Sequence, residues 1–130
     1  MKLKMFSLGL AVVALFLCNG CVLFLVGGAA AAGAGTVLYV NGELKDTEAA
    51  SLERTRTATL AALHDLQYAV VGDTKDALNA KITARTGGDK KVQIYLAKQS
   101  PEVTEIRIRV ETFGDEQLSR QVLEKIKAHL

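Results

Sequence analysis

Hydrophobic and charged residues alternate most regularly over residues 104–111. Ile106, Ile108 and Val110 are apolar, and the residues between them are charged. This period of two predicts a β-strand with one buried and one solvated face. Shorter stretches of β-forming residues predict strands over residues 68–71, 80–86 and 91–97, and one over residues 36–47 that is turned or bulged at Asn41-Gly42.

Two further segments repeat their apolar residues at the spacing of an α-helix. Ser51 is placed to cap the N-terminus of the first helix, over residues 51–66. The second, over residues 114–130, begins with acidic and ends with basic residues, as the helix dipole favours. The expected buried stripes are Leu52, Thr59, Ala62, Leu63 and Leu66 in the first helix, and Leu118, Val122, Ile126 and Leu130 in the second.

Glycine and proline mark the turns between the strands. Gly72-Asp73 is expected to end the strand over residues 68–71, and Gly87-Gly88-Asp89 predicts a hairpin. Pro101 predicts another turn. The apolar side of the first strand is expected to hold Leu38, Val40 and Leu44.

The junction between the last strand and the last helix has a mechanical interpretation. Gly114 permits backbone angles that other residues avoid, and Asp115 is expected to cap the helix. Phe113 is expected to pack against the first helical turn, near Leu118.

These elements predict an α+β fold in two layers. An antiparallel sheet of four or five strands carries both helices on one face, in the order β-α-β-β-β(-β)-α, after a hydrophobic N-terminal segment. The residues expected to meet between the layers are Leu63, Leu66, Val92, Ile94, Ile106, Ile108, Val110, Leu118, Val122 and Ile126.

The N-terminal segment has the layout of a secretory signal. Two lysines precede residues 5–17, which are almost entirely apolar, and a small residue stands before Cys21. Gly20-Cys21 resembles the lipobox of bacterial lipoproteins, in which the cysteine sulfur receives a diacylglycerol and the chain is cut just before it. The resemblance implies that residues 1–20 are a signal peptide and that Cys21 is the lipid-attachment residue.

An uncleaved transmembrane helix over residues 5–26 is the alternative, because about 20 apolar residues span a bilayer. Lys2 and Lys4 would then stay cytoplasmic. Both interpretations place the domain outside the cytoplasm, in the cell envelope and facing the periplasm. Val22 replaces the aspartate that resembles an inner-membrane retention signal, so the outer membrane is favoured if the host has two. A Cys-x-x-Cys redox pair is disfavoured, since no βαβ pattern surrounds it.

Residues 21–36 are the expected tether between the lipid and the domain at residues 37–130. Small residues at such spacings allow helices to approach closely in a membrane. One interpretation is therefore a membrane-embedded structural protein that self-associates through this segment. The other is a compact apolar linker that holds the domain near the bilayer. The glycines concerned are Gly27, Gly28, Gly33 and Gly35, which alternate with four alanines.

Three stretches resemble a family of small bacterial lipoproteins described only as a domain of unknown function. They are Gly42-Glu43-Leu44, residues 58–63, and residues 112–126, in which Phe113-Gly114-Asp115-Glu116 with Ser119 is the most specific part. The resemblance extends over almost the whole chain, including the cysteine followed by a Gly/Ala-rich segment. It implies an envelope location and a compact α+β fold, and it brings no catalytic residues.

The pattern argues against an enzyme, a metal or cofactor site, and nucleic-acid binding. His64, expected at the surface beside Asp65, and His129, expected at a helix end, have no Cys or His at ligand spacing. Ser119 and Asp115 are spaced as neighbours on a helix, and no Gly-x-Ser-x-Gly elbow is present. The net charge of +2 is too balanced for nucleic acid. The expected partners are the membrane, through the lipid, and a second copy or another envelope component.

The polar side of the predicted sheet is rich in basic residues. They are Lys81 and Arg85, which alternate with Thr83, then Lys91 with Gln93 and Tyr95, then Arg107 and Arg109. If these strands pair, the five cations gather on one open face. Arginine holds phosphate or carboxylate bidentately, so anionic lipid, lipopolysaccharide or a cell-wall polymer is the expected ligand. An ordinary solvated face is the alternative, because Glu105 and Glu111 share it and cross-strand pairs of opposite charge are common.

Overall fold

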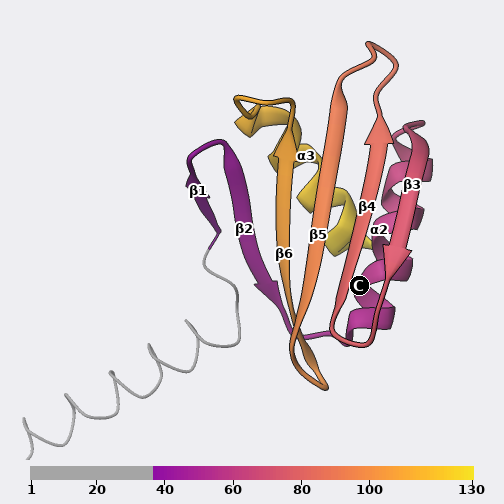
Figure 1. Ribbon diagram of the computed structural model, residues 1–130, viewed down its shortest axis with the longest axis vertical. Helices are drawn as coiled ribbons and strands as arrows, with labels where there is room; N and C mark the ends of the chain where they lie inside the picture. Colours follow the sequence, from indigo (N-terminus) through magenta and orange to yellow (C-terminus); the bar gives the residue numbers. More distant parts are fainter. Residues whose placement is uncertain (1–36) are drawn as a thin grey trace, which may run out of the picture. The chain divides into compact units, whose positions relative to one another are not determined.

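The computed structural model describes residues 37–130. Within them the chain forms an antiparallel sheet and two helices, which confirms the α+β prediction (Figure 1). The predictions for the signal peptide, for Cys21, for the transmembrane alternative and for the Gly/Ala segment lie outside the described residues.

The sheet has six strands, whereas the sequence predicted four or five. All pairs are antiparallel, in the spatial order β1-β2-β6-β5-β4-β3, so β2 and β6 are neighbours although they are far apart in the chain (Figure 1). The strands are β1 (Leu38–Val40), β2 (Glu43–Glu48), β3 (Ala69–Lys75), β4 (Asn79–Arg85), β5 (Lys91–Ser100) and β6 (Val103–Val110).

One additional strand arises from the turn at Asn41-Gly42. These residues have positive φ angles of 52° and 79°, as the two-residue hairpin turn preferred by Asn-Gly requires. The turn pairs Tyr39 with Leu44, so these two residues share the helix-facing side. The expectation that Leu38 and Val40 lie on the same side as Leu44 is wrong, because the hairpin turn places them on the opposite face.

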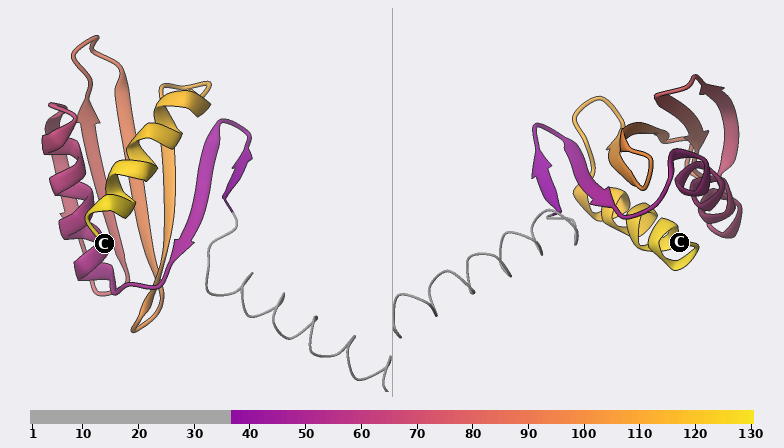
Figure 2. Two further views of the ribbon diagram at one scale, coloured as in Figure 1. Left: turned by 180° about the vertical axis from the view of Figure 1, so that it is seen from behind. Right: turned by 90° about the horizontal axis from the view of Figure 1, so that it is seen from below.

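Both helices cover one face of the sheet, and Figure 2 shows them side by side on it. The Ser51 side chain accepts a hydrogen bond from the N–H of Arg54 at 3.2 Å. The Asp115 side chain accepts one from the N–H of Leu118 at 3.0 Å. Both predicted N-caps are therefore confirmed, and the helices that they begin are α2 (Leu52–Asp65) and α3 (Glu116–Ala128).

Strand β3 continues past Gly72-Asp73, where the sequence predicted its end. A β-bulge between Val70 and Gly72 shifts the register, and pairing resumes with Gly72 opposite Thr83 and Asp73 opposite Ile82. Asp73 accepts a hydrogen bond from Nε of Arg56 in α2 at 3.2 Å. A dipeptide typical of turns therefore stays within a strand, because the bulge absorbs one residue and an ion pair holds Asp73.

The hydrophobic core lies between the helices and the sheet. Eight of the ten predicted core residues are only 0–1% exposed, while Leu66 and Leu118 are half-buried at its rim. Leu123 is buried as well, because α3 presents to the sheet a face wider than the single predicted stripe.

A charged cluster is buried at the edge of this core. The side chain of Asp46, in β2, is 1% exposed, and its Oδ2 lies 2.7 Å from Nζ of Lys127 in α3. The same Nζ lies 3.3 Å from Oε1 of Glu48. Burial, and then the neighbouring Asp46, raises the pKa of Glu48. Burial opposes the charge on Lys127, but its two carboxylate partners outweigh this and raise its pKa.

The turn between β6 and α3 is closed by a contact between two glycines. Gly114 has a φ of 85°, and a Cβ atom there would lie 2.4 Å from Cα of Gly42 and 2.5 Å from the hydroxyl of Tyr39. The special backbone predicted for Gly114 is confirmed. The predicted packing of Phe113 against Leu118 is wrong, since Phe113 is 93% exposed. Its backbone carbonyl, and not its ring, meets the Gly42 turn.

Candidate anion-binding face

The sheet face opposite the helices has no covering element within residues 37–130, and Figure 1 looks onto it. The strands that carry the predicted cations are neighbours, because β4, β5 and β6 pair in succession. The structure therefore brings all five predicted cations onto one surface, the basic face: Lys81 and Arg85 of β4, Lys91 of β5, and Arg107 and Arg109 of β6.

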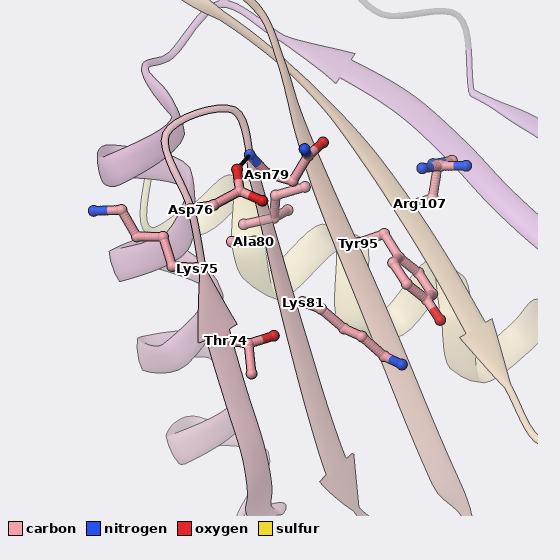
Figure 3. A pocket seen from close by; sticks show the side chains of 9 residues that line it. Thr74, Lys75, Asp76, Asn79, Ala80, Lys81, Tyr95 and Arg107 are labelled. Atoms are coloured by element: carbon pink, nitrogen blue, oxygen red, sulfur yellow. Dashed lines mark hydrogen bonds between the residues drawn. The ribbon is translucent and has the colours of Figure 1, made fainter.

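Strand register arranges these side chains in rows across the sheet. Tyr95 of β5 has Lys81 of β4 opposite it on one side and Arg107 of β6 on the other. Nζ of Lys81 lies 5.2 Å from the centroid of the Tyr95 ring, and Cζ of Arg107 lies 5.7 Å from it (Figure 3). Cations within about 6 Å of a ring centroid are attracted to its face. Tyr95 therefore orients a cation on each side of its ring.

A cavity of about 290 Å³ lies beside this row, lined by Lys81, Tyr95, Arg107 and Asp76 among others (Figure 3). Asp76 is its one acidic residue. Oδ1 of Asp76 accepts hydrogen bonds from the backbone N–H groups of Leu78 and Asn79, both at 2.8 Å. These bonds lower the pKa of Asp76. The carboxylate in the cavity thus has its own partners, and the two cations beside Tyr95 are not among them.

Carboxylates do share the open face, as the alternative of an ordinary solvated surface requires. Each arginine of the basic face has a carboxylate nearby: Arg107 with Glu105 at 3.2 Å, Arg109 with Glu43 at 3.6 Å, and Arg85 with Asp89 at 3.6 Å. Exposed pairs such as Arg107–Glu105 and Arg85–Asp89 contribute only about 0–1 kcal/mol, so they are readily exchanged for another anion. Glu43, the partner of Arg109, is only 15% exposed. Among residues 37–130, no carboxylate oxygen lies within 4.0 Å of Nζ of Lys81 or Nζ of Lys91, although the backbone N–H of Lys91 donates a hydrogen bond to Oε1 of Glu111 at 2.7 Å.

The sequence reasoning missed an exposed apolar corner beside the basic face, formed by Leu38, Val40 and Phe113. Leu38 and Val40 are 51% and 49% exposed, on the same side of the sheet as the cations. Phe113 is counted with them through its backbone alone, which meets Gly42, two residues after Val40, while its side chain is 93% exposed. A signal was present, since all three residues of β1 are apolar. Side chains alternate between the two faces of a strand, so an all-apolar strand with one open face leaves some of its apolar side chains in water.

The other residues considered for chemistry lie elsewhere. Nε2 of His129 lies 2.6 Å from Oδ2 of Asp65, and this bond lowers the pKa of Asp65. The predicted exposure of His64 and the predicted place of His129 at the end of α3 are confirmed, and it is His129 that pairs with Asp65. Asp115 caps α3 and Ser119 is fully buried, so the two do not share an open site. The described part of the chain contains no cluster of three metal-ligating side chains, and none of its helices is long and apolar enough to cross a membrane.

The fold and this surface define a class of protein: a two-layer α+β domain with one helix-covered and one open, basic sheet face. The chain belongs to DUF3568, a family of proteins of unknown function, whose profile matches residues 4–129. This confirms the prediction that the chain belongs to a family known only as a domain of unknown function. The matched region includes the apolar N-terminal segment as well as the domain. No curated protein matches the chain.

Proposed function

We propose that this protein is a membrane-anchored binding module of the bacterial cell envelope, and that its basic face binds anionic groups. The observation that carries the proposal is the gathering of five cations, from three neighbouring strands, on a face left open by the described residues. Phosphates and carboxylates are the natural ligands of such a face, because arginine binds both bidentately. The proposal involves no catalytic step.

The anchor in this proposal is a lipid on Cys21, exposed as the first residue when residues 1–20 are removed. Its support is the basic start of the chain, the apolar stretch and Gly20-Cys21. The family profile matches the chain from residue 4 onward and so includes the apolar stretch and Gly20-Cys21. The domain then faces the periplasm, from the outer membrane if the host has two, because Val22 follows the cysteine in place of aspartate.

The spacing of the cations favours an extended ligand over a single small ion. Neighbouring strands lie about 4.8 Å apart, so the backbones at Lys81 and Arg107, two strands apart, are separated by about 10 Å. Lys91 and Arg109 line a second hollow of about 270 Å³, together with Glu111, whose carboxylate accepts a hydrogen bond from the backbone N–H of Lys91. Two such cationic groups on one face match a polymer or a surface that repeats its negative charges.

The anchor is tested by the intact mass of protein extracted from bacterial membranes. The wild type is expected to begin at Cys21 and to carry lipid, whereas Cys21→Ala is expected to remain an uncleaved precursor. Normal cleavage of the wild type without added lipid contradicts this part of the proposal.

Binding is tested with inorganic polyphosphate, titrated calorimetrically into the full-length protein in zwitterionic nanodiscs. Lys81→Gln/Lys91→Gln is expected to weaken binding at least tenfold, because one hydrogen bond to a charged group contributes about 1.5 kcal/mol or more. Arg120→Gln/Lys125→Gln is the matched control, since it also removes two charges and both residues are exposed on α3, in the opposite layer. An equal loss in the control would mean that only net charge matters, which contradicts a binding face.

A further inference from the structure

The apolar corner and the basic face form one continuous surface. Leu38 stands opposite Lys45, and Lys45 stands opposite Arg107. The row that contains Tyr95 and Lys81 therefore runs without a break to the β1 edge of the sheet. Cations occupy the middle of this surface and exposed apolar side chains occupy one end. Such a surface matches a partner that offers negative charge and apolar groups together.

A lipid bilayer is the partner that fits both halves of this surface. Its anionic headgroups attract basic residues, and its interface accepts aromatic and aliphatic side chains. A soluble polyanion would neutralise the cations but leave Leu38, Val40 and Phe113 in water. A second copy of the same face would set like charges against one another, which opposes association.

In the order of the chain, β1 directly follows the apolar segment that precedes the domain. Residues 22–36 are uncharged, and Val37 directly precedes β1. A lipid on Cys21 would therefore hold β1 close to the bilayer, because only the short tether separates them. We infer that the open face docks on the anionic surface of the bilayer that holds the anchor, with the apolar corner inserted at the interface. The inference rests on the proposed function, since it requires an anchored chain.

A single introduced tryptophan can report on docking, because the chain has none of its own. Phe113→Trp places the reporter at the apolar corner, and Gln121→Trp places a control on an exposed position of α3. The full-length variants are reconstituted in nanodiscs of phosphatidylcholine, with or without phosphatidylglycerol. In the anionic discs, Phe113→Trp is expected to emit at shorter wavelength and to be quenched by brominated lipid, while Gln121→Trp emits alike in both. Val40→Trp reports on the same corner if circular dichroism shows that Phe113→Trp is misfolded.

The electrostatic half of the inference is tested in the Phe113→Trp background. Lys81→Glu/Lys91→Glu changes the two cations that have no carboxylate partner among the described residues. A basic residue near an anionic bilayer contributes about fivefold to binding, so the ratio of docked to undocked protein is expected to fall at least about 30-fold. Arg120→Glu/Lys125→Glu makes the same change of net charge at exposed positions of α3 and is expected to leave the ratio unchanged. Raising the salt to about 1 M is expected to act like the double variant, because it shortens the screening length from about 8 to about 3 Å.

Identical emission from Phe113→Trp in neutral and anionic discs overturns the inference. If polyphosphate still binds the basic face in that case, the partner is a soluble polymer and the proposed function stands. A wild-type chain that the discs do not retain overturns both proposals, since both require an anchor.

Discussion

Replacing Lys127 by methionine tests how much the buried charged cluster contributes to the fold. Methionine keeps most of the aliphatic side chain and removes the ammonium group that lies 2.7 Å from Asp46 and 3.3 Å from Glu48. The carboxylate of Asp46, 1% exposed, is then buried without a cation and next to a second carboxylate.

The size of the effect follows from the burial of the two partners. Removing one partner of a buried ion pair costs about 3–5 kcal/mol. Because the Lys127 side chain is 32% exposed, water reaches the site, and we expect the lower value of about 3 kcal/mol at pH 7. For a domain of this size, 1 kcal/mol changes Tm by about 4–8 °C, so Tm is expected to fall by about 12–24 °C.

The loss should depend on pH in a defined direction. The pKa of Glu48 is already raised, and removing Lys127 takes away the partner that lowers it. A carboxyl group with a raised pKa in the folded state favours folding below its unfolded pKa, and this contribution is lost as the pH rises through the folded value. The variant should therefore approach wild-type stability as the pH falls toward 4.5, the ordinary pKa of glutamate.

Urea and thermal unfolding, followed by circular dichroism at pH 7 and pH 5, measure both effects. Lys125→Met is the exposed control in the same helix. Asp46→Asn/Lys127→Met is expected to recover most of the stability, because the carboxylate that is 1% exposed is removed and only Glu48, with 22% of its side chain exposed, is left without its cation. A loss below about 0.5 kcal/mol for Lys127→Met, the range of ordinary surface substitutions, would refute the reasoning.

Three further substitutions test the core and the turns by the same unfolding measurements. Ile108→Ala is expected to cost about 2–5 kcal/mol, and a near-neutral result would exclude Ile108 from the core. Asp115→Ala is expected to cost about 0.5–2 kcal/mol, while Asp115→Asn is expected to keep a stability close to that of the wild type. If Asp115→Asn folds but has the same cellular phenotype as deletion of the protein, Asp115 belongs to a functional site. Gly114→Ala is expected to cost more than the about 1–2 kcal/mol of a left-handed backbone alone, since its Cβ also meets Gly42 and Tyr39, and an unchanged Tm would show that the turn adapts.

Local regularity in the sequence predicted the elements whose stability is largely local. Alternation located the central strands, and the caps at Ser51 and Asp115 were predicted because a capping bond joins residues three apart. The errors arose where distant parts of the chain decide the local structure. Strand β3 passes through Gly72-Asp73 because its backbone is paired with β4 and because Asp73 bonds to Arg56 of α2. Phe113 lies in water because a glycine far away in the sequence meets its backbone.

In the candidate site, too, local features were predictable from the sequence and contacts between distant parts of the chain were not. Alternation placed Lys81 and Arg107 on the polar side of their strands, but only the order of the strands in the sheet puts Tyr95 between them. The ion pair of Asp46 with Lys127 was not predictable from spacing, since its partners belong to different layers. The side of a strand on which a residue lies follows from local alternation, whereas the residues beside it on neighbouring strands depend on the order and register of the strands in the sheet.

The position of β2 between β1 and β6 has a consequence for how the chain reaches its native state. Of the elements in residues 37–130, the β1–β2 hairpin is synthesised first, and β6, the only other neighbour of β2 among them, is the last strand. A two-stranded hairpin is at best marginally stable in water, and long-range pairing is slow to form. One edge of β2 therefore stays open until β6 has been made, and an open edge is a place where another chain can pair. A chain that stops before β6 is thus expected to aggregate, and not simply to lack one strand.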